Sequence, residues 1–154
     1  MNKERVLAVA DAIEALVVNG NPVPGLGFNM SGWVADPGEE ACAEDHSRHM
    51  CSTTACIAGW TVALFDKVSA AEMHSMVGDH VALVGIESRA TELLGLSVGQ
   101  AHALFYAEGS GKLLEDVTPE EAIATLRDLA ESEHIQWHLH CGGAEDTEDE
   151  EHGE

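Results

Sequence analysis

The segment Thr118-Pro119-Glu120-Glu121-Ala122-Ile123 opens the clearest helix of this chain. Thr118 is a favoured N-cap residue, proline is favoured in the first helical turn, and a glutamate three residues after the cap can bond back to the cap backbone. Ile123, Leu126 and Leu129 then recur at helical spacing. The stretch therefore predicts an amphipathic helix with one buried face.

Similar signals predict helices in the rest of the chain. Apolar residues recur at helical spacing over residues 3–18, and Asn19-Gly20 predicts the end of that helix. Thr53 is expected to cap a helix over residues 54–65, and Ser69 and Ser97 each begin a capping-box pattern. Gly95 is expected to end a preceding helix in a left-handed cap, and residues 78–86 favour helix over strand.

The expected fold class is all-α, with about five or six short helices in one compact domain. The domain is expected to cover residues 1–141, and the acidic residues 142–154 are expected to form a disordered tail. A long Pro/Gly loop over residues 21–27 interrupts the helices. Phe28, Met30 and Trp33 are expected to hold this loop against the core.

The formal net charge is −21, from 28 acidic and 7 basic residues. Because affinity for nucleic acid comes largely from Lys and Arg, this charge argues against direct binding to nucleic acid and to anionic membranes. A basic protein partner is the natural complement. The leading hypothesis is a non-enzymatic interaction protein that binds a basic surface of a nucleic-acid-processing protein, as an inhibitor that imitates the charge of DNA. Acidity that serves only solubility is the alternative.

The location expected from the sequence is the cytoplasm. No apolar run approaches the ~20 residues of a membrane span, and Asp11 and Glu14 interrupt the apolar stretch near the N-terminus. In that compartment thiols stay reduced. The four cysteines are therefore expected to bind metal, act in catalysis or pack in the core.

A cluster of metal-ligand residue types precedes Gly59-Trp60: Cys42, His46, His49, Cys51 and Cys56. Zinc prefers four nitrogen or sulfur ligands, usually supplied as closely spaced pairs. The sequence therefore predicts, as the second hypothesis, a small zinc-binding module with ligands Cys51, Cys56, His46 and His49. The alternative places Cys56 in the core as a small apolar residue and leaves the histidines in solvent.

A second cluster of ligand types lies near the C-terminus: Glu131, His134, His138, His140 and Cys141. If the preceding helix continued, His134 and His138 would share one face and could chelate a metal. The alternative, which we favour, is a polar helix end at which histidine is favoured by the terminal carbonyl groups.

A third class of function is a metal-dependent or cysteine hydrolase. Cys51 or Cys56 beside a histidine and an acid would supply the nucleophile, but the spacing selects neither pair. No Gly-rich phosphate loop is present. Residues 88–106 superficially match a helix-turn-helix, but the second helix carries no Lys or Arg for contacts to DNA.

The segment Cys51-Ser52-Thr53-Thr54-Ala55-Cys56-Ile57-Ala58-Gly59-Trp60 resembles a motif of uncharacterised small proteins from bacteria and tailed phages. Those proteins typically read Cys-Gly-Thr-x-x-Cys-Ile-Ala-Gly, and the resemblance extends over about residues 25–130. The chain departs from that pattern at Ser52, where the family has Gly. The resemblance implies no established activity, but it implies an origin in a phage or mobile element.

Overall fold

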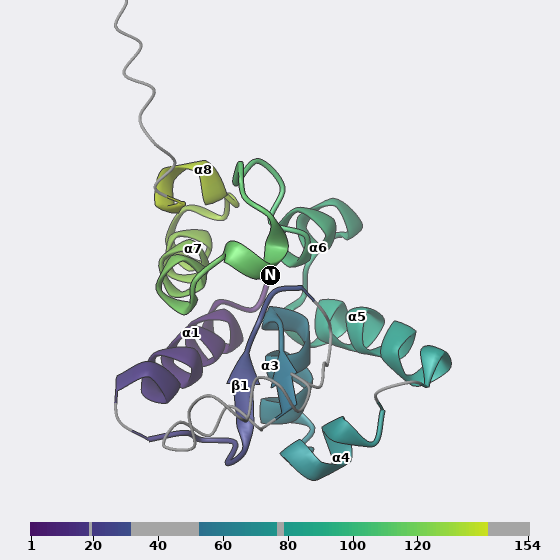
Figure 1. Ribbon diagram of the computed structural model, residues 1–154. Coiled ribbons are helices and arrows are strands. Elements are labelled where there is room, and N and C mark those ends of the chain that lie inside the picture. The colour runs from purple at the N-terminus through teal and green to yellow at the C-terminus, as the bar shows by residue number, and fades with distance from the viewer. Residues whose placement is uncertain (19, 32–52, 77–78, 142–154) are drawn as a thin grey trace, which may run out of the picture.

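The computed structural model describes residues 1–18, 20–31, 53–76 and 79–141 of the chain. These residues form seven α-helices, a short 3-10 helix and a two-stranded parallel sheet (Figure 1). In chain order the elements are α1 (Lys3–Val18), β1 (Leu26–Phe28), β2 (Thr53–Ala55), α3 (Ile57–Phe65), α4 (Ala70–His74), α5 (His80–Leu94), α6 (Val98–Phe105), η1 (Leu114–Asp116), α7 (Pro119–Ser132) and α8 (Trp137–His140). The expected helical architecture is confirmed, although the helices are more numerous than predicted.

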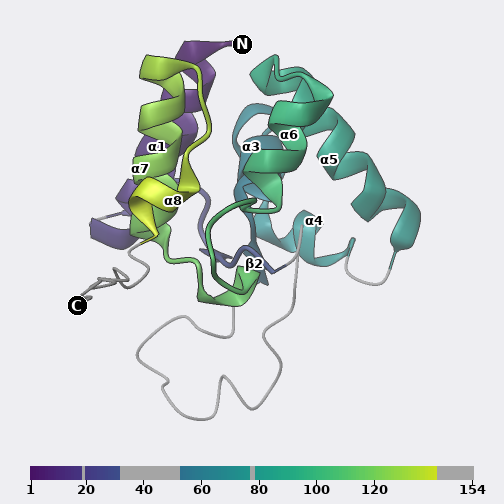
Figure 2. The same ribbon diagram turned by 90° about the horizontal axis from the view of Figure 1, so that it is seen from above.

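The helix α1 makes one of the main helix contacts of the fold. Its most extensive contact is with α7, and it also contacts α3 and α5. Figure 2 shows α1 and α7 side by side, with α3, α5 and α6 on the other side of the molecule. Val6, Val9 and Ile13 of α1 are fully buried. Full burial of such side chains contributes about 1.5–3 kcal/mol each, so this contact is a main source of stability.

The sheet was not predicted, and it changes the start of the next helix. Leu26 pairs with Thr53 and Phe28 with Ala55 in parallel register. Thr53 therefore belongs to a strand, and the predicted helix cap at this residue is wrong. The helix begins at Ile57, with Cys56 in the N-cap position. Pairing across the long intervening segment satisfies the backbone groups of Thr53–Ala55, and a local helix signal does not contain that information.

The loop before β1 is ordered by side-chain hydrogen bonds. Asn21 donates to the Leu26 carbonyl at 2.9 Å and accepts from the Val23 N–H at 2.9 Å. Trp60 of α3 is fully buried, and its indole N–H donates to the Gly27 carbonyl at 2.9 Å. Met30 is buried, as expected. The other predicted anchor, Trp33, lies outside the described residues, as does the predicted tail at 142–154.

The predicted N-cap residues are confirmed at α4, α6 and α7. The side chain of Ser69 accepts from the Glu72 N–H in α4. Ser97 and Thr118 each form a complete capping box, at α6 and α7. Residues 78–86 were predicted to favour helix over strand, and α5 indeed begins at His80, after the N-cap Asp79. These caps are short-range, which explains why sequence patterns located them.

Two glycines of α5 differ in whether the fold has room for a side chain at their position. Gly95 ends the helix with a φ of 68°, and a Cβ atom there would lie 3.2 Å from the Asn2 nitrogen. Gly85 lies inside the helix, and a Cβ atom there would meet nothing within 4 Å. The fold therefore needs glycine at position 95 and leaves space for a side chain at position 85.

These positions make a matched pair for a stability test. Gly95→Ala should lower the free energy of unfolding by about 1–2 kcal/mol, because alanine is strained at positive φ and the added methyl meets the N-terminal backbone. Gly85→Ala should raise it by about 0.5–1 kcal/mol, because alanine favours helix. Urea denaturation of both variants and wild type measures these changes. Equal effects of the two substitutions would contradict this assignment.

Candidate functional site

Of the four predicted zinc ligands, the structure describes only Cys56. Cys56 lies in the N-cap position of α3. His46, His49 and Cys51, together with Cys42, lie outside the described residues. Within the described residues, no group of three His, Cys, Asp or Glu side chains is placed to hold a metal ion. The zinc hypothesis therefore stays a prediction that depends on residues 42–51.

Cys56 is a buried thiol, with only 1% of its surface exposed. Burial raises the pKa of this thiol to about 11, although backbone N–H groups of Gly59 and Ala58 act in the opposite direction. At neutral pH the side chain is therefore protonated. A nucleophile requires the thiolate, whereas this environment suits the alternative in which Cys56 is a small apolar core residue.

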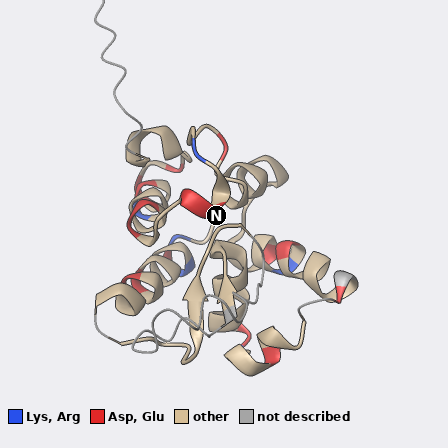
Figure 3. Ribbon diagram, viewed as in Figure 1, with Lys and Arg blue, Asp and Glu red and all other residues tan. Residues whose placement is uncertain are grey.

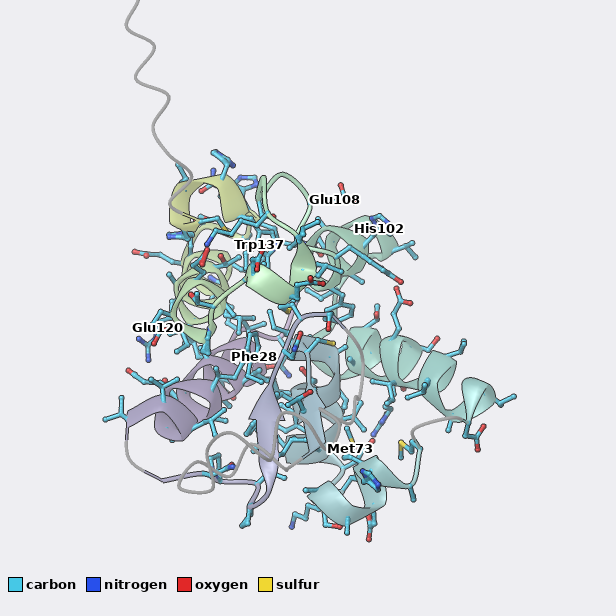
Figure 4. The ribbon with its side chains drawn as sticks, in the orientation of Figure 1. Phe28, Met73, His102, Glu108, Glu120 and Trp137 are labelled. Atoms are coloured by element: carbon cyan, nitrogen blue, oxygen red, sulfur yellow. The ribbon has the colours of Figure 1, made fainter. Side chains whose placement is uncertain are left out.

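Polar side chains lie on α6 beside this region. Tyr106 donates to Glu87 at 3.4 Å, and its ring lies 4.6 Å from the His102 ring. His102 Nδ1 in turn forms a pair with the Glu108 carboxylate. Figure 4 shows His102 and Glu108 at the outer edge of the molecule. The groups that act on the Cys56 thiol include Glu87 but not His102 or Glu108.

The predicted histidine pair near the C-terminus does not form. The helix α7 ends at Ser132, and Glu133 adopts a left-handed conformation with a φ of 66°. The Ser132 hydroxyl accepts from the His134 N–H at 3.1 Å, so a local side-chain bond replaces the next helical bond. His134 therefore precedes a separate helix, α8, that contains His138. The condition for a shared histidine face, one helix that continues through both residues, is therefore not met.

The structure instead joins Cys141 to a buried carboxylate that the sequence did not single out as a site. Glu121 accepts a hydrogen bond from the Lys112 ammonium at 2.6 Å and completes the capping box with Thr118. Burial acts to raise the pKa of Glu121, but hydrogen bonds from Lys112, Cys141 and Thr118 lower it below its ordinary value. Burial and the contact with Glu121 raise the pKa of Cys141 to about 12.

This Lys112–Glu121–Cys141 cluster holds the C-terminal part of the described fold. Trp137 of α8 is fully buried and donates from its indole nitrogen to the Ala103 carbonyl at 3.0 Å, and Figure 4 shows it between α8 and the α6 side of the molecule. Glu121 is recognisable from sequence as a capping residue. Its contacts with Lys112 and Cys141 cannot be recognised from sequence, because those two residues come from separate segments.

Most of the described cations are held by groups of the fold. Arg89 binds Asp66 at 2.8 Å, and Arg127 binds Glu14 at 2.6 Å. Arg5 donates to the Leu93 carbonyl at 3.0 Å, with its guanidinium over the Phe65 ring. Together with the buried Lys112 pair, these contacts engage four of the six Lys and Arg in the described ranges. Few positive charges are left to offset the surface carboxylates.

The acidic residues are spread over several elements. Figure 3 shows Asp and Glu on α1, α4, α5, η1 and α7, with fewer Lys and Arg between them. Glu115, Asp116 and Glu120 are exposed and lie close together in sequence, in η1 and the first turn of α7. The surface therefore carries distributed negative charge, with one dense stretch at η1.

Comparisons of the chain with protein-family models, with curated proteins and with solved structures find no match. Among the described helices, none combines the length and apolar character needed to cross a membrane.

The ionic cluster makes a pH-dependent prediction. Lys112→Met should lower the free energy of unfolding by about 1–3 kcal/mol at neutral pH, because it leaves the Glu121 carboxylate buried without its cation. Since the folded-state pKa of Glu121 is lowered, the stabilisation is present above its ordinary pKa and is lost as pH falls through the folded value. Urea denaturation across pH 3–7 measures it. Lys3→Met is the exposed control, and an equal loss in both variants would show that the cluster contributes nothing specific.

The zinc hypothesis makes a separate prediction. Protein purified without a polyhistidine tag should contain stoichiometric zinc by native mass spectrometry. A chelator should then lower the melting temperature sharply, because a structural zinc site contributes about 10–16 kcal/mol of apparent binding free energy. Cys51→Ala should reproduce that loss. Metal-free protein with unchanged melting would rule the site out.

Proposed function

We propose that this chain is a non-enzymatic interaction protein that binds a basic surface of a nucleic-acid-processing protein. The chain acts as an inhibitor in this proposal, because it presents carboxylates where the partner binds phosphates. Such a contact is electrostatic in origin, so it increases the association rate and weakens as salt screens the charges.

One observation supports this proposal above the others: four of the six Lys and Arg in the described ranges are engaged within the fold. Arg89 and Arg127 are bound by carboxylates and Arg5 by a backbone carbonyl. An acidic chain that used its carboxylates only for solubility has no need of this arrangement. The described surface carries more exposed Asp and Glu than exposed Lys and Arg, which suits a partner of the opposite sign.

The dense acidic stretch at η1 and α7 is the first candidate contact for that partner. Glu115, Asp116 and Glu120 are exposed, and Figure 3 shows η1 in red beside the start of α7. Exposed carboxylates that are close in sequence provide negative charge of the kind that a phosphate backbone carries. Arginine and lysine side chains that bind phosphate also bind carboxylate.

An origin in a phage or mobile element belongs to the same proposal. It is supported by the resemblance of the segment from Cys51 to Trp60 to proteins of bacteria and tailed phages. In that setting the partner would be a protein of the bacterial host, and the contact would take place in the host cytoplasm.

A competition assay tests the proposal. A basic, nonspecific DNA-binding protein is loaded with fluorescent duplex DNA, and the chain is added at increasing salt. We expect displacement of the DNA at low salt and about tenfold or greater weakening at moderate salt. The triple variant Glu115→Gln/Asp116→Asn/Glu120→Gln should compete less well.

The control variant is Val98→Ser, which removes an exposed apolar side chain on α6 and leaves the charge unchanged. It should compete as wild type does. Absence of competition, or competition that is insensitive to ionic strength, would exclude the electrostatic mode of binding.

A further inference from the structure

The N-terminal half of α5 carries an apolar face that no element of the described fold covers. Val81 is 83% exposed and Val84 is 56% exposed. Figures 1 and 2 both show this end of α5 as the outermost part of the molecule on its side. Single exposed apolar residues need no explanation, whereas a contiguous group on one helix face indicates a contact surface.

The exposed positions follow helical spacing. Val84 and Gly85 follow Val81 by three and four residues, and Ser88 follows them by four and three. All four are exposed, so they form one stripe along α5. The opposite side of the helix is buried through Ile86, Ala90 and Leu94. The helix therefore has two apolar sides, of which only one belongs to the core.

Gly85 provides an independent argument. A glycine inside a helix costs about 0.5–1 kcal/mol relative to alanine. The fold gives no reason for it, because a Cβ atom at this position would meet nothing within 4 Å. The small side chains of Gly85 and Ser88 would let the backbone of another helix approach this face closely.

The charges around the stripe select the kind of partner. The N-cap Asp79 lies at one end of α5 and the exposed Glu92 near the other, with Glu87 between them. The cation of this helix, Arg89, is bound by Asp66 and Glu92. A second copy of this chain would bring equal acidic rims together, which is unfavourable. A helix with flanking Lys and Arg is complementary.

We infer that the Val81–Val84–Gly85–Ser88 stripe of α5 binds an amphipathic helix of a basic protein, with apolar residues against the valines and cations beside Asp79 and Glu92. This inference rests on the proposed function, since it names the surface and the partner element for the same interaction. Apolar contact supplies affinity in the centre and charge supplies selectivity at the rim.

The test uses two synthetic helical peptides as probes. One carries leucine on one face and lysine on the other, and the second replaces each leucine with alanine at the same charge. Binding is measured by fluorescence anisotropy, and the contact is located from backbone amide chemical shifts. We expect the leucine peptide to bind more tightly, with shifts concentrated in α5.

The variant Val81→Ser/Val84→Ser should weaken binding of the leucine peptide about tenfold. The matched control is Val17→Ser/Val18→Ser, which changes two exposed valines on α1 and should leave the affinity within about twofold of wild type. Thermal melting checks that each variant is folded. If the α5 variant fails to fold, the location of the wild-type shifts decides the result.

The other outcomes separate this inference from the proposed function. Equal binding of both peptides, equal effects of the two double variants, or shifts outside α5 overturn the α5 inference, while salt-dependent binding still supports the acidic interaction protein. Failure of both peptides to bind overturns both. Concentration-dependent dimerisation that Val81→Ser/Val84→Ser abolishes would assign the stripe to a second copy and overturn the inference.

Discussion

The packing of α1 against α7 is the interaction on which the rest of this structure depends. It joins elements from opposite ends of the described chain, and its buried side includes Val6, Val9 and Ile13 of α1. The same helix also contacts α3 and α5, and α3 in turn packs against α5. Removal of α1 would expose apolar sides of all three neighbours at once. The charged contact of Arg127 with α1 is exposed and adds little to that burial.

The surface of the described fold is acidic because the chain has few Lys and Arg residues, and most of those described bind other groups of the fold. Lys112 is committed to the buried carboxylate of Glu121, and Arg89 and Arg127 to carboxylates at helix contacts. Each pair joins two parts of the fold and neutralises one carboxylate. Exposed carboxylates such as Glu115 and Glu120 remain in excess, because the sequence holds 28 acidic and only 7 basic residues.

The candidate sites were only partly predictable from the sequence, because the properties of a site depend on side chains from different segments that the fold brings into contact. The sequence pointed to Cys56, but its burial and the resulting rise of its pKa to about 11 became known from the fold. The meeting of Lys112, Glu121 and Cys141 has no local signature. The sequence around Val81 and Val84 predicted helix over strand but not an exposed apolar stripe. A helix with two apolar sides does not show the usual amphipathic pattern.

The sequence by itself determined the existence of the main helices, several of their ends and the sign of the surface charge. Caps such as Ser97 and Thr118 act within one turn, and charge is additive along a chain. Only the tertiary structure decided the β1–β2 pairing, the place of Cys56 before α3 and the end of α7 at Ser132. The pairing and the core position of Cys56 depend on contacts between segments far apart in the sequence. The end of α7 depends on a choice between side-chain and backbone hydrogen bonds, and the folded environment makes that choice.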